Sequence, residues 1–248
     1  MILILSDLHL GKSDPVAERA KERDVVNVIR SYQDRLKGLY LLGDIFDHYV
    51  EYRLAIPKGF SRFLGTLADV ADEGSEIVYF YGNHDPWHLN FFREEFNARI
   101  VEDSTTDRVG HQEVYFAHGD GRSKGLYKTL RPILRHRLPT MMYRYLLPGD
   151  TGISLARWSS RRFSARETNM ETVESMREYA FNKLTGSADI VVMGHCHFAE
   201  LSNTEDGIYM NTGSWHDDRT FGIIDNNISL MRWTGTEEAS LNTIPLAQ

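Results

Sequence analysis

Histidine, aspartate and asparagine residues follow five apolar segments of this sequence, at the point where each segment ends. Imidazole and carboxylate groups suit Mn, Fe or Zn better than Ca. Seven such side chains are too many for one tetrahedral ion, and they suit two ions that share one carboxylate. The seven candidate ligands are Asp7, His9, Asp44, Asn83, His118, His195 and His197. We therefore expect two divalent metal ions as cofactors, with Mn²⁺ as the expected ion and Fe or Zn as the alternatives.

Two pairs of these ligands have a spacing of two residues. Asp7 and His9 form an Asp-x-His pair, and His195 and His197 form a His-x-His pair. In extended backbone alternate side chains point to the same face, so we expect both members of a pair to reach one site. By the same geometry Cys196 points away and packs as a small residue. An isolated pair of this kind belongs more often to a solvated loop, but five sets that each end an apolar segment favour a metal site.

The apolar run Tyr79-Phe80-Tyr81 is followed by the motif Gly82-Asn83-His84-Asp85. Alone, this motif is typical of a turn, because Gly, Asn and Asp favour loops. Together with the other sets it indicates catalysis, since a rigid sheet fixes the position of chemistry that its loops carry. Two divalent ions roughly 3.5–4 Å apart promote in-line displacement at phosphorus, and phosphoryl transfer needs little else from a protein. The sequence therefore indicates phosphoester chemistry.

Strands and helices alternate along the first two thirds of the chain. Three strand-helix units with polar residues at the strand ends indicate an α/β fold. Asp14 and Pro15 are suited to the N-cap and first turn of a helix. Asp206-Gly207 and Asn226-Asn227 are hairpin signals, so we expect the chain to close with an antiparallel meander. The expected strands are 1–6, 39–42, 77–81, 114–117, 190–193, one near 201, 208–210, 221–224 and 228–233, and the expected helices are 15–32, 58–72, 87–96 and 167–184.

The composition is that of an ordinary soluble globular protein. Hydrophobic residues make up 42% of the chain and charged residues 25%. Cys196 is the single cysteine, so no internal disulfide forms and we expect a reducing compartment. The apolar start, residues 1–5, is too short for a signal peptide or a membrane span. We therefore expect a cytoplasmic protein.

Positive charge is concentrated in residues 121–166. This segment holds eleven Lys and Arg against one acid, a local charge of +10 in a chain of net charge −7, which leaves −17 for the rest. Apolar residues are interspersed with helical periodicity, and we expect Pro132, Pro139 and Pro148 to break the segment into short helices. Such segregation of charge indicates an anionic partner. A solvated helical face or a dimer contact is the alternative, and the oligomeric state stays open.

The strand-end motifs together resemble those of the calcineurin-like metallophosphoesterase superfamily, over residues 1 to about 200. The matching residues are Asp7-x-His9, Gly43-Asp44, Gly82-Asn83-His84-Asp85, His118 and Gly194-His195-x-His197. The resemblance implies a four-layer α-β-β-α sandwich, with residues 1–248 as one domain and residues 121–166 as an inserted helical cap.

The same resemblance assigns the site residues. One metal ion is held by Asp7, His9, Asp44 and His197, and the other by Asp44, Asn83, His118 and His195. Asp44 then bridges the two ions. His84 is implied to meet the scissile phosphate and to stabilise or protonate the leaving oxygen, and Asp85 to orient His84.

Within the superfamily the chain is most similar to the UDP-2,3-diacylglucosamine hydrolases of lipid A synthesis. The similar stretches are 6–10, 43–47, 118–120 with the basic insertion that follows, and 213–216. The better-known branch carries Arg where this chain has His84, so the similarity is to a divergent branch. It implies cleavage of the substrate diphosphate to UMP and 2,3-diacylglucosamine 1-phosphate.

The expected partner is therefore a nucleotide-linked glycolipid, for which the insertion supplies cationic and apolar groups. Guanidinium groups bind phosphate bidentately, and an amphipathic basic surface also suits peripheral attachment to an anionic inner-membrane surface. The candidate substrate contacts are Arg157, Ser160, Arg161, Arg162 and His216.

Two other functions stay open at this point. The first is a phosphodiesterase or phosphatase that acts on nucleotides or nucleic acid, for which His84 is equally suited. We expect no nucleic-acid partner, because the insertion is rich in Leu and Met and poor in the interleaved aromatics that stack on bases. The second is a non-catalytic scaffold on the same fold, which should have lost metal ligands, whereas all seven are present.

Overall fold

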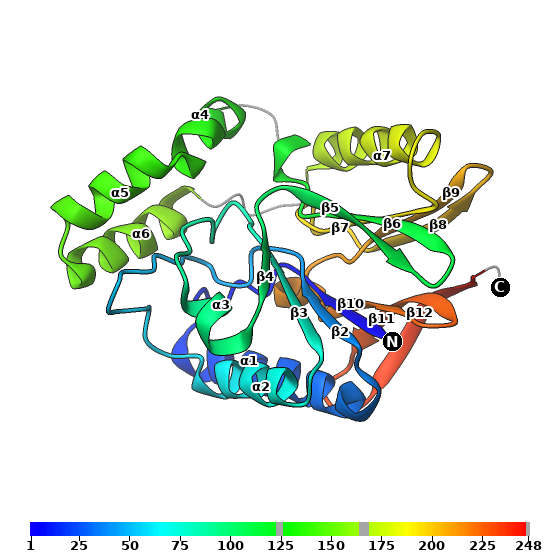
Figure 1. Ribbon diagram of the computed structural model, residues 1–248, viewed down its shortest axis with the longest axis horizontal. Helices are drawn as coiled ribbons and strands as arrows, with labels where there is room; N and C mark the ends of the chain where they lie inside the picture. Colours follow the sequence, from blue (N-terminus) through cyan, green and yellow to red (C-terminus); the bar gives the residue numbers. More distant parts are fainter. Residues whose placement is uncertain (123–125, 164–168, 247–248) are drawn as a thin grey trace.

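The computed structural model describes residues 1–122, 126–163 and 169–246, without the side chains of 122, 126–128 and 161–163. Two β-sheets form its centre (Figure 1). The larger sheet has the strand order β12-β11-β10-β1-β2-β3-β4, and the smaller has the order β5-β6-β7-β9-β8. The strands are β1 (Ile2–Leu5), β2 (Gly38–Leu41), β3 (Glu76–Phe80), β4 (Arg99–Val101), β5 (Ser104–Val109), β6 (Gln112–Ala117), β7 (Ile190–Met193), β8 (Glu200–Thr204), β9 (Gly207–Asn211), β10 (Thr220–Ile224), β11 (Asn227–Trp233) and β12 (Glu238–Pro245).

Helices cover the outer face of each sheet (Figure 1). The helices α1, α2 and α3 lie on the larger sheet and α7 lies on the smaller one, while α4, α5 and α6 follow one another in the segment between β6 and α7. The helices are α1 (Pro15–Tyr32), α2 (Ser61–Asp72), α3 (Phe91–Phe96), α4 (Leu126–Arg135), α5 (Arg137–Leu146), α6 (Gly149–Phe163), α7 (Met170–Leu184) and α8 (Trp215–Asp218).

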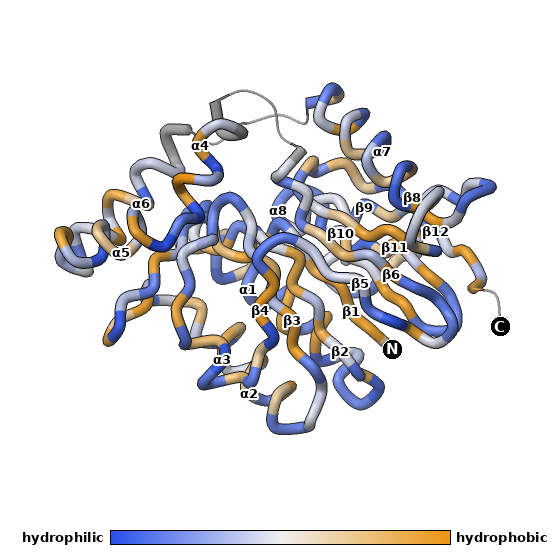
Figure 2. The backbone as a smooth tube through the Cα atoms, turned by 45° about the horizontal axis from the view of Figure 1, so that its top comes forward, coloured by the Kyte–Doolittle hydropathy of each residue, from blue (hydrophilic) through white to orange (hydrophobic). Residues whose placement is uncertain are grey.

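Alternation of side chains in the buried strands produces four layers. In β1, Leu3 and Leu5 pack with helix residues such as Val25 of α1, while Ile4 belongs to the core between the sheets. In β7, Val192 faces the core between the sheets. Strands that are apolar on both faces must be covered on both sides, and Figure 2 shows hydrophobic residues along β1 and β3 in the centre of the larger sheet. The expected α-β-β-α sandwich is confirmed.

The helix start at Asp14 is as expected. The Asp14 carboxylate accepts hydrogen bonds from the N–H groups of Val16 and Ala17, with Pro15 in the first turn. The next two helices start later than expected. At the start of α2, Phe60 has left-handed backbone with φ of 59° and so lies outside the helix. At the start of α3, the carboxylate of Glu51 accepts hydrogen bonds from the N–H groups of Leu89, Asn90 and Phe91.

The expected closing meander is wrong in part. Only β10, β11 and β12 form an antiparallel meander, in the larger sheet. The hairpin β8-β9 joins the smaller sheet instead, where β9 pairs in parallel with β7. The strands β4, β5 and β12 were not expected at all. Local hairpin signals do not tell which sheet a hairpin joins, because that depends on pairing with a distant strand.

The prediction that three prolines break the basic segment into short helices is only partly correct. Pro132 lies inside α4, where it removes one helix hydrogen bond without ending the helix. Pro139 lies in the first turn of α5, where an N–H group has no helical partner in any case. The break between α4 and α5 occurs at His136, whose ring accepts a hydrogen bond from the N–H of Leu138 as the N-cap of α5. Pro148 precedes α6 as expected.

Candidate metal centre

All seven predicted ligands lie beyond the carboxyl ends of parallel strands. Strands β1, β2 and β3 run parallel in the larger sheet, and β6 and β7 run parallel in the smaller one. The loops after β1 and β2 continue the pairing of those strands, since the N–H of Asp7 donates to the carbonyl of Gly43 and that of His9 to the carbonyl of Asp44. The two sheets therefore bring their strand ends to one region.

One group of possible ligands comprises Asp7, His9 and His197, whose donor atoms lie within 4.8 Å of one another. His197 Nε2 lies 3.2 Å from Asp7 Oδ1 and 3.3 Å from His9 Nε2. Asp7 Oδ1 is buried and has no hydrogen-bond partner among the described residues. A buried carboxylate oxygen beside two imidazole nitrogens fits a divalent cation.

The second group comprises Asp44, His118 and His195, again with donor atoms within 4.8 Å of one another. His118 Nε2 lies 3.6 Å from Asp44 Oδ2 and 3.3 Å from Asn83 Oδ1. Asp44 Oδ2 also lies 3.9 Å from His9 Nε2 of the first group. The carboxylate of Asp44 thus stands between the two groups, in the position that a shared ligand requires.

The backbone at this site is mostly not extended, which corrects one expectation. Five of the seven candidate ligands are left-handed, with φ of 52° at Asp7, 43° at His9, 51° at Asp44, 69° at His195 and 54° at His197. The paired ligands converge through turns and not through the alternation of a strand. Left-handed backbone at a non-glycine residue costs of the order of 1–3 kcal/mol, and such strain clusters at functional sites.

Two glycines allow the acids to approach neighbouring backbone. A Cβ at Gly82 would lie 2.0 Å from Asp44 Oδ1, and one at Gly194 would lie 2.8 Å from Asp7 Oδ2. Asp44 Oδ1 instead accepts a hydrogen bond from the N–H of His84, and Asp7 Oδ2 accepts one from the N–H of His195. The glycine that opens each of these motifs is therefore required by space.

Outer contacts orient two ligand imidazoles. His118 Nδ1 lies 2.7 Å from the carbonyl of Leu42, and His197 Nδ1 lies 2.8 Å from Asp217 Oδ2. A donor proton on each Nδ1 leaves Nε2 free to act as a ligand. Asp217 was not predicted, although its place just after the motif ending in His216 is a sequence signal that points to this site.

Charges at the site hold its acids ionised. Burial alone would raise the pKa of Asp44, but the nearby His118 and His84 outweigh burial and hold it well below its usual range. Burial likewise lowers the pKa of His118, but Asp44 outweighs it and raises that pKa to about 10. Without a metal ion, a protonated imidazole supplies the positive charge beside the carboxylate. A divalent cation that binds displaces this proton and supplies the positive charge in its place.

Asp85 does not make the contact that was expected of it. Its side chain is completely buried and accepts hydrogen bonds from the N–H groups of Asp44, Ile45, Phe46 and Gly82 and from the hydroxyl of Tyr79. Both of its oxygens are turned to these donors. Asp85 therefore anchors the loop of Asp44 against the loop of Gly82, and the His84 ring has other partners.

The His84 ring is held by Asp47 and by the basic segment. His84 Nδ1 lies 3.0 Å from the backbone carbonyl of Asp47 and 3.3 Å from Ser160 Oγ of α6. The Ser160 hydroxyl donates to Asp47 Oδ2 at 2.8 Å, so toward His84 Nδ1 its oxygen acts as the acceptor. With its proton on Nδ1, His84 turns Nε2 toward Asp44 Oδ2, 4.0 Å away.

The other expected substrate contacts are placed as follows. Arg157 is exposed on α6, and the side chains of Arg161 and Arg162 lie outside the described residues. His216 begins the turn after Trp215 and packs beside His9, with ring centroids 5.9 Å apart. Burial and the charge of nearby Lys21 lower the pKa of His216 to about 4, so its ring is neutral near pH 7.

Part of the positive charge of the basic segment is used inside the protein. Arg131 and Arg135 of α4 both bind the buried carboxylate of Asp120, and Arg135 also donates to the carbonyl of Gly82. Arg144 of α5 donates to the backbone carbonyls of Glu51 and Trp87. These three arginines attach the basic segment to the loops of the site, so their guanidinium groups are paired within the protein.

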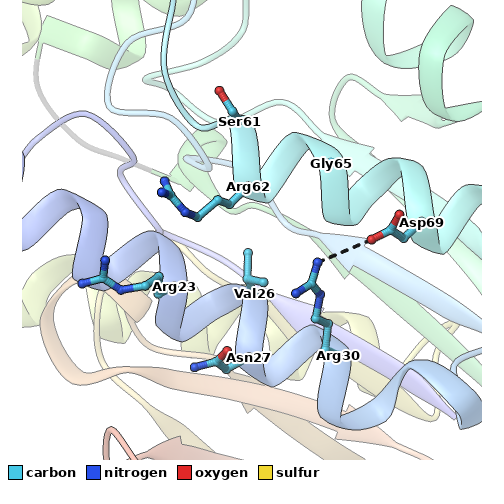
Figure 3. Close-up of a pocket in the computed structure, with 8 residues that line it drawn as sticks. All are labelled: Arg23, Val26, Asn27, Arg30, Ser61, Arg62, Gly65 and Asp69. Atoms are coloured by element: carbon cyan, nitrogen blue, oxygen red, sulfur yellow. Dashed lines mark ion pairs between the residues drawn. The ribbon is translucent and has the colours of Figure 1, made fainter.

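A surface hollow of about 500 Å³ lies between α1 and α2 (Figure 3). None of the candidate ligands lines it. Two of its three arginines already face carboxylates, Arg30 with Asp69 at 3.6 Å and Arg62 with Glu22 at 3.3 Å. The hollow therefore has no part in the chemistry of the metal ligands.

Comparison with known proteins agrees with this arrangement. Residues 1–199 match the model of the calcineurin-like phosphoesterases. The chain belongs to this family, and it is a metal-dependent hydrolase, as expected. Among solved structures, the phosphoesterase Yfce from E. coli aligns over 99% of both chains with a TM-score of 0.50 and 16% identity, which supports the fold.

Two similar curated proteins carry the same name. A UDP-2,3-diacylglucosamine hydrolase of Porphyromonas gingivalis is 31% identical over 180 residues, which cover 69% of this chain and 68% of the relative. A protein of the same name from Pseudomonas putida is 28% identical over 203 residues, which cover 79% of this chain and 82% of the relative. Among the described residues, no single helix is both long enough and apolar enough to cross a membrane.

Proposed function

We propose that this protein hydrolyses the diphosphate of UDP-2,3-diacylglucosamine to UMP and 2,3-diacylglucosamine 1-phosphate. The observation that carries the proposal is the set of neighbouring groups of possible metal ligands, two of which contain Asp44, in a chain with relatives named for this reaction. The donor set of imidazoles and carboxylates supports Mn²⁺ as the ion, with Fe or Zn as alternatives. Bound divalent ions would polarise the phosphate and lower the pKa of the attacking water.

His84 is proposed as the catalytic acid. Its Nδ1 faces the Asp47 carbonyl, which leaves Nε2 as the atom that meets the scissile phosphate. Donating a proton from Nε2 requires the imidazolium form, in which both nitrogens carry protons. Asp47 Oδ1 lies 3.8 Å from His84 Nδ1. Although burial would raise the pKa of Asp47, His48 and His84 outweigh burial and keep the carboxylate charged.

Residues 121–166 are proposed as a cap inserted into a single domain of residues 1–248. The described part of α5 and α6 has many exposed apolar side chains beside the exposed Arg137 and Arg157. Such a surface suits a substrate with two acyl chains and the anionic membrane surface that holds it. The exposed apolar residues of these two helices are Leu138, Met141, Met142, Tyr145, Leu146, Leu155 and Trp158.

The test is turnover of UDP-2,3-diacylglucosamine with added Mn²⁺, with the products identified by mass spectrometry. UMP and the diacylglucosamine 1-phosphate, both lost on chelation and restored by metal, are the expected result. Asp44→Asn is the inactive control. Asp103→Asn is the matched active control, because it makes the same change of net charge at an exposed acid. Hydrolysis of bis(p-nitrophenyl) phosphate or of a nucleotide without release of UMP would replace the lipid substrate by a general phosphodiester. If the metal-loaded protein hydrolyses none of these esters, the proposed enzymatic function is wrong.

A further inference from the structure

Lys21 is a buried cation beside the metal centre that has had no role so far. Its side chain comes from α1 and is 1% exposed. Its Nζ lies 2.6 Å from the carbonyl of His9, 3.2 Å from His216 Nδ1 and 3.2 Å from Glu18 Oε1. An ammonium group has three donors and no acceptor, and here it makes two hydrogen bonds, to His9 and His216, and an ion pair with Glu18.

These contacts determine which nitrogen of His216 carries the proton. Because the Lys21 ammonium can only donate, His216 Nδ1 must accept, and the ring proton of neutral His216 is then on Nε2. The ligands His118 and His197 have the opposite arrangement, since their Nδ1 atoms face the oxygens of Leu42 and Asp217. The ligand imidazoles thus present a lone pair at Nε2, whereas His216 presents an N–H.

His216 is placed to use this N–H at the edge of the site. Its backbone N–H donates to the carbonyl of Asp7, and its ring packs edge-on to that of His9. The ring remains partly open to solvent, with 18% of the side chain exposed. Nε2 lies 3.9 Å from Asp217 Oδ1, which is beyond hydrogen-bond distance. The proton on Nε2 is therefore available to a ligand.

Stability alone does not account for a lysine at this position. Taking an ammonium group out of water is unfavourable unless its partners compensate, and an apolar side chain would fill the same volume without that penalty. Glu18 would balance the charge of Lys21 without any contact to His216. The hydrogen bond to His216 is the contact that reaches the site.

We propose that Lys21 is a positioning residue that holds His216 as its Nε2–H tautomer, so that His216 donates a hydrogen bond to a phosphate oxygen of the substrate. The tautomer is a property of the folded chain and is independent of the substrate. The donation to phosphate rests on the proposed function.

The tautomer is tested by long-range ¹H–¹⁵N correlation NMR of the ¹⁵N-histidine protein at pH 7.5. The protein is loaded with Zn²⁺, which is diamagnetic, and His216→Ala assigns the resonances. The expected pattern is an unprotonated Nδ1 and a protonated Nε2. In Lys21→Met, which keeps the length of the side chain without its donors, the Nδ1–H form should become populated. Glu18→Gln is the matched control, because it removes the ion pair and leaves both hydrogen bonds of Lys21, and its pattern should equal that of the parent.

The catalytic consequence is tested by a double-mutant cycle. Lys21→Met and His216→Ala should each lower kcat/KM roughly tenfold or more, because a hydrogen bond to a charged phosphate is lost. Lys21→Met should have almost no further effect in the His216→Ala background. Metal content measured by mass spectrometry should stay that of the parent in both single variants.

Two results would overturn the inference. One is the Nδ1–H tautomer in the parent protein, a measurement that stands even if Lys21→Met does not fold. The other is full additivity of the two substitutions in kcat/KM. A protein with the expected tautomer that does not cleave the diphosphate would contradict the proposed function and leave the role of Lys21 in place.

Discussion

Asp120→Asn tests whether the buried acid that holds the insertion stabilises the protein. Asp120 is 3% exposed and binds Arg131 Nε at 2.9 Å and Arg135 Nη2 at 2.8 Å. Burial would raise the pKa of Asp120, but Arg135, His118 and Arg131 outweigh burial and lower that pKa to about 2, whereas an unperturbed Asp has a pKa of about 3.9. At 1.36 kcal/mol per pKa unit, this difference corresponds to about 2 kcal/mol of stability at pH 7.

The sign of the pH dependence follows from the direction of the shift. The folded state binds a proton on Asp120 less readily than the unfolded state does, so the contribution is fully present above about pH 4. It is lost as the pH falls from about 4 to 2. Asp120→Asn should therefore lower the free energy of unfolding by about 2 kcal/mol at pH 7 and flatten its decline in acid.

The assay is urea unfolding followed by circular dichroism at several pH values. Asp103→Asn is the matched control, because Asp103 pairs with the same two arginines but its side chain is 68% exposed. An exposed ion pair contributes about 0–1 kcal/mol, so this variant should change the free energy of unfolding by less than 1 kcal/mol. Equal losses in the two variants, or an unchanged acid limb in Asp120→Asn, would refute the reasoning.

Three further predictions concern the site and its support. His84→Ala should lower kcat by about 10²–10⁴ while metal content and the free energy of unfolding stay near the parent values, because the hydrogen-bond partners of the ring are Asp47 and Ser160. His84 also forms a possible ligand group with His9 and Asp44, so loss of metal in this variant would make His84 a ligand instead. Asp44→Asn should release metal from both groups, since its carboxylate stands between them, so dialysed protein should hold less than half of the parent's metal by mass spectrometry; retention of one full equivalent would contradict sharing. His88 stacks on Tyr49 and Tyr81, and burial lowers its pKa to about 3. The parent protein should therefore lose about 1.4 kcal/mol of stability for each pH unit below 6.5, and His88→Phe should remove this pH dependence in thermal unfolding. An identical pH dependence in the two proteins would show that His88 is not its source.

Local pattern was sufficient for the elements that carry the ligands. Residues such as Leu3 and Leu5 are apolar on both sides of Ile4, and a short run of this kind must be a strand covered on both faces. Because a strand ends where polar residues begin, the positions of Asp7 and Asp44 at strand ends could be read from residue order alone. The capped start of α1 at Asp14 was predictable for the same local reason.

The tertiary structure decided the contacts that depend on residues far apart in the chain. Left-handed backbone at His9 and His197 replaced the expected alternation, because their loops are shaped by packing against other strand ends. Asp85 binds the loop of Asp44 and not the ring of His84, although His84 is its neighbour in sequence. Arg135, which the sequence showed only as one of the basic residues of 121–166, binds Asp120.

The amino-acid sequence by itself determined which side chains are candidate ligands and at which strand ends they lie, because residue type and hydrophobic period act over a few neighbours. Only the tertiary structure decided how those groups face one another. The proton on His216 illustrates the difference, since it depends on Lys21, 195 residues away in the chain. A hydrogen bond has a direction that no local pattern encodes, so it is decided when the folded chain brings donor and acceptor together.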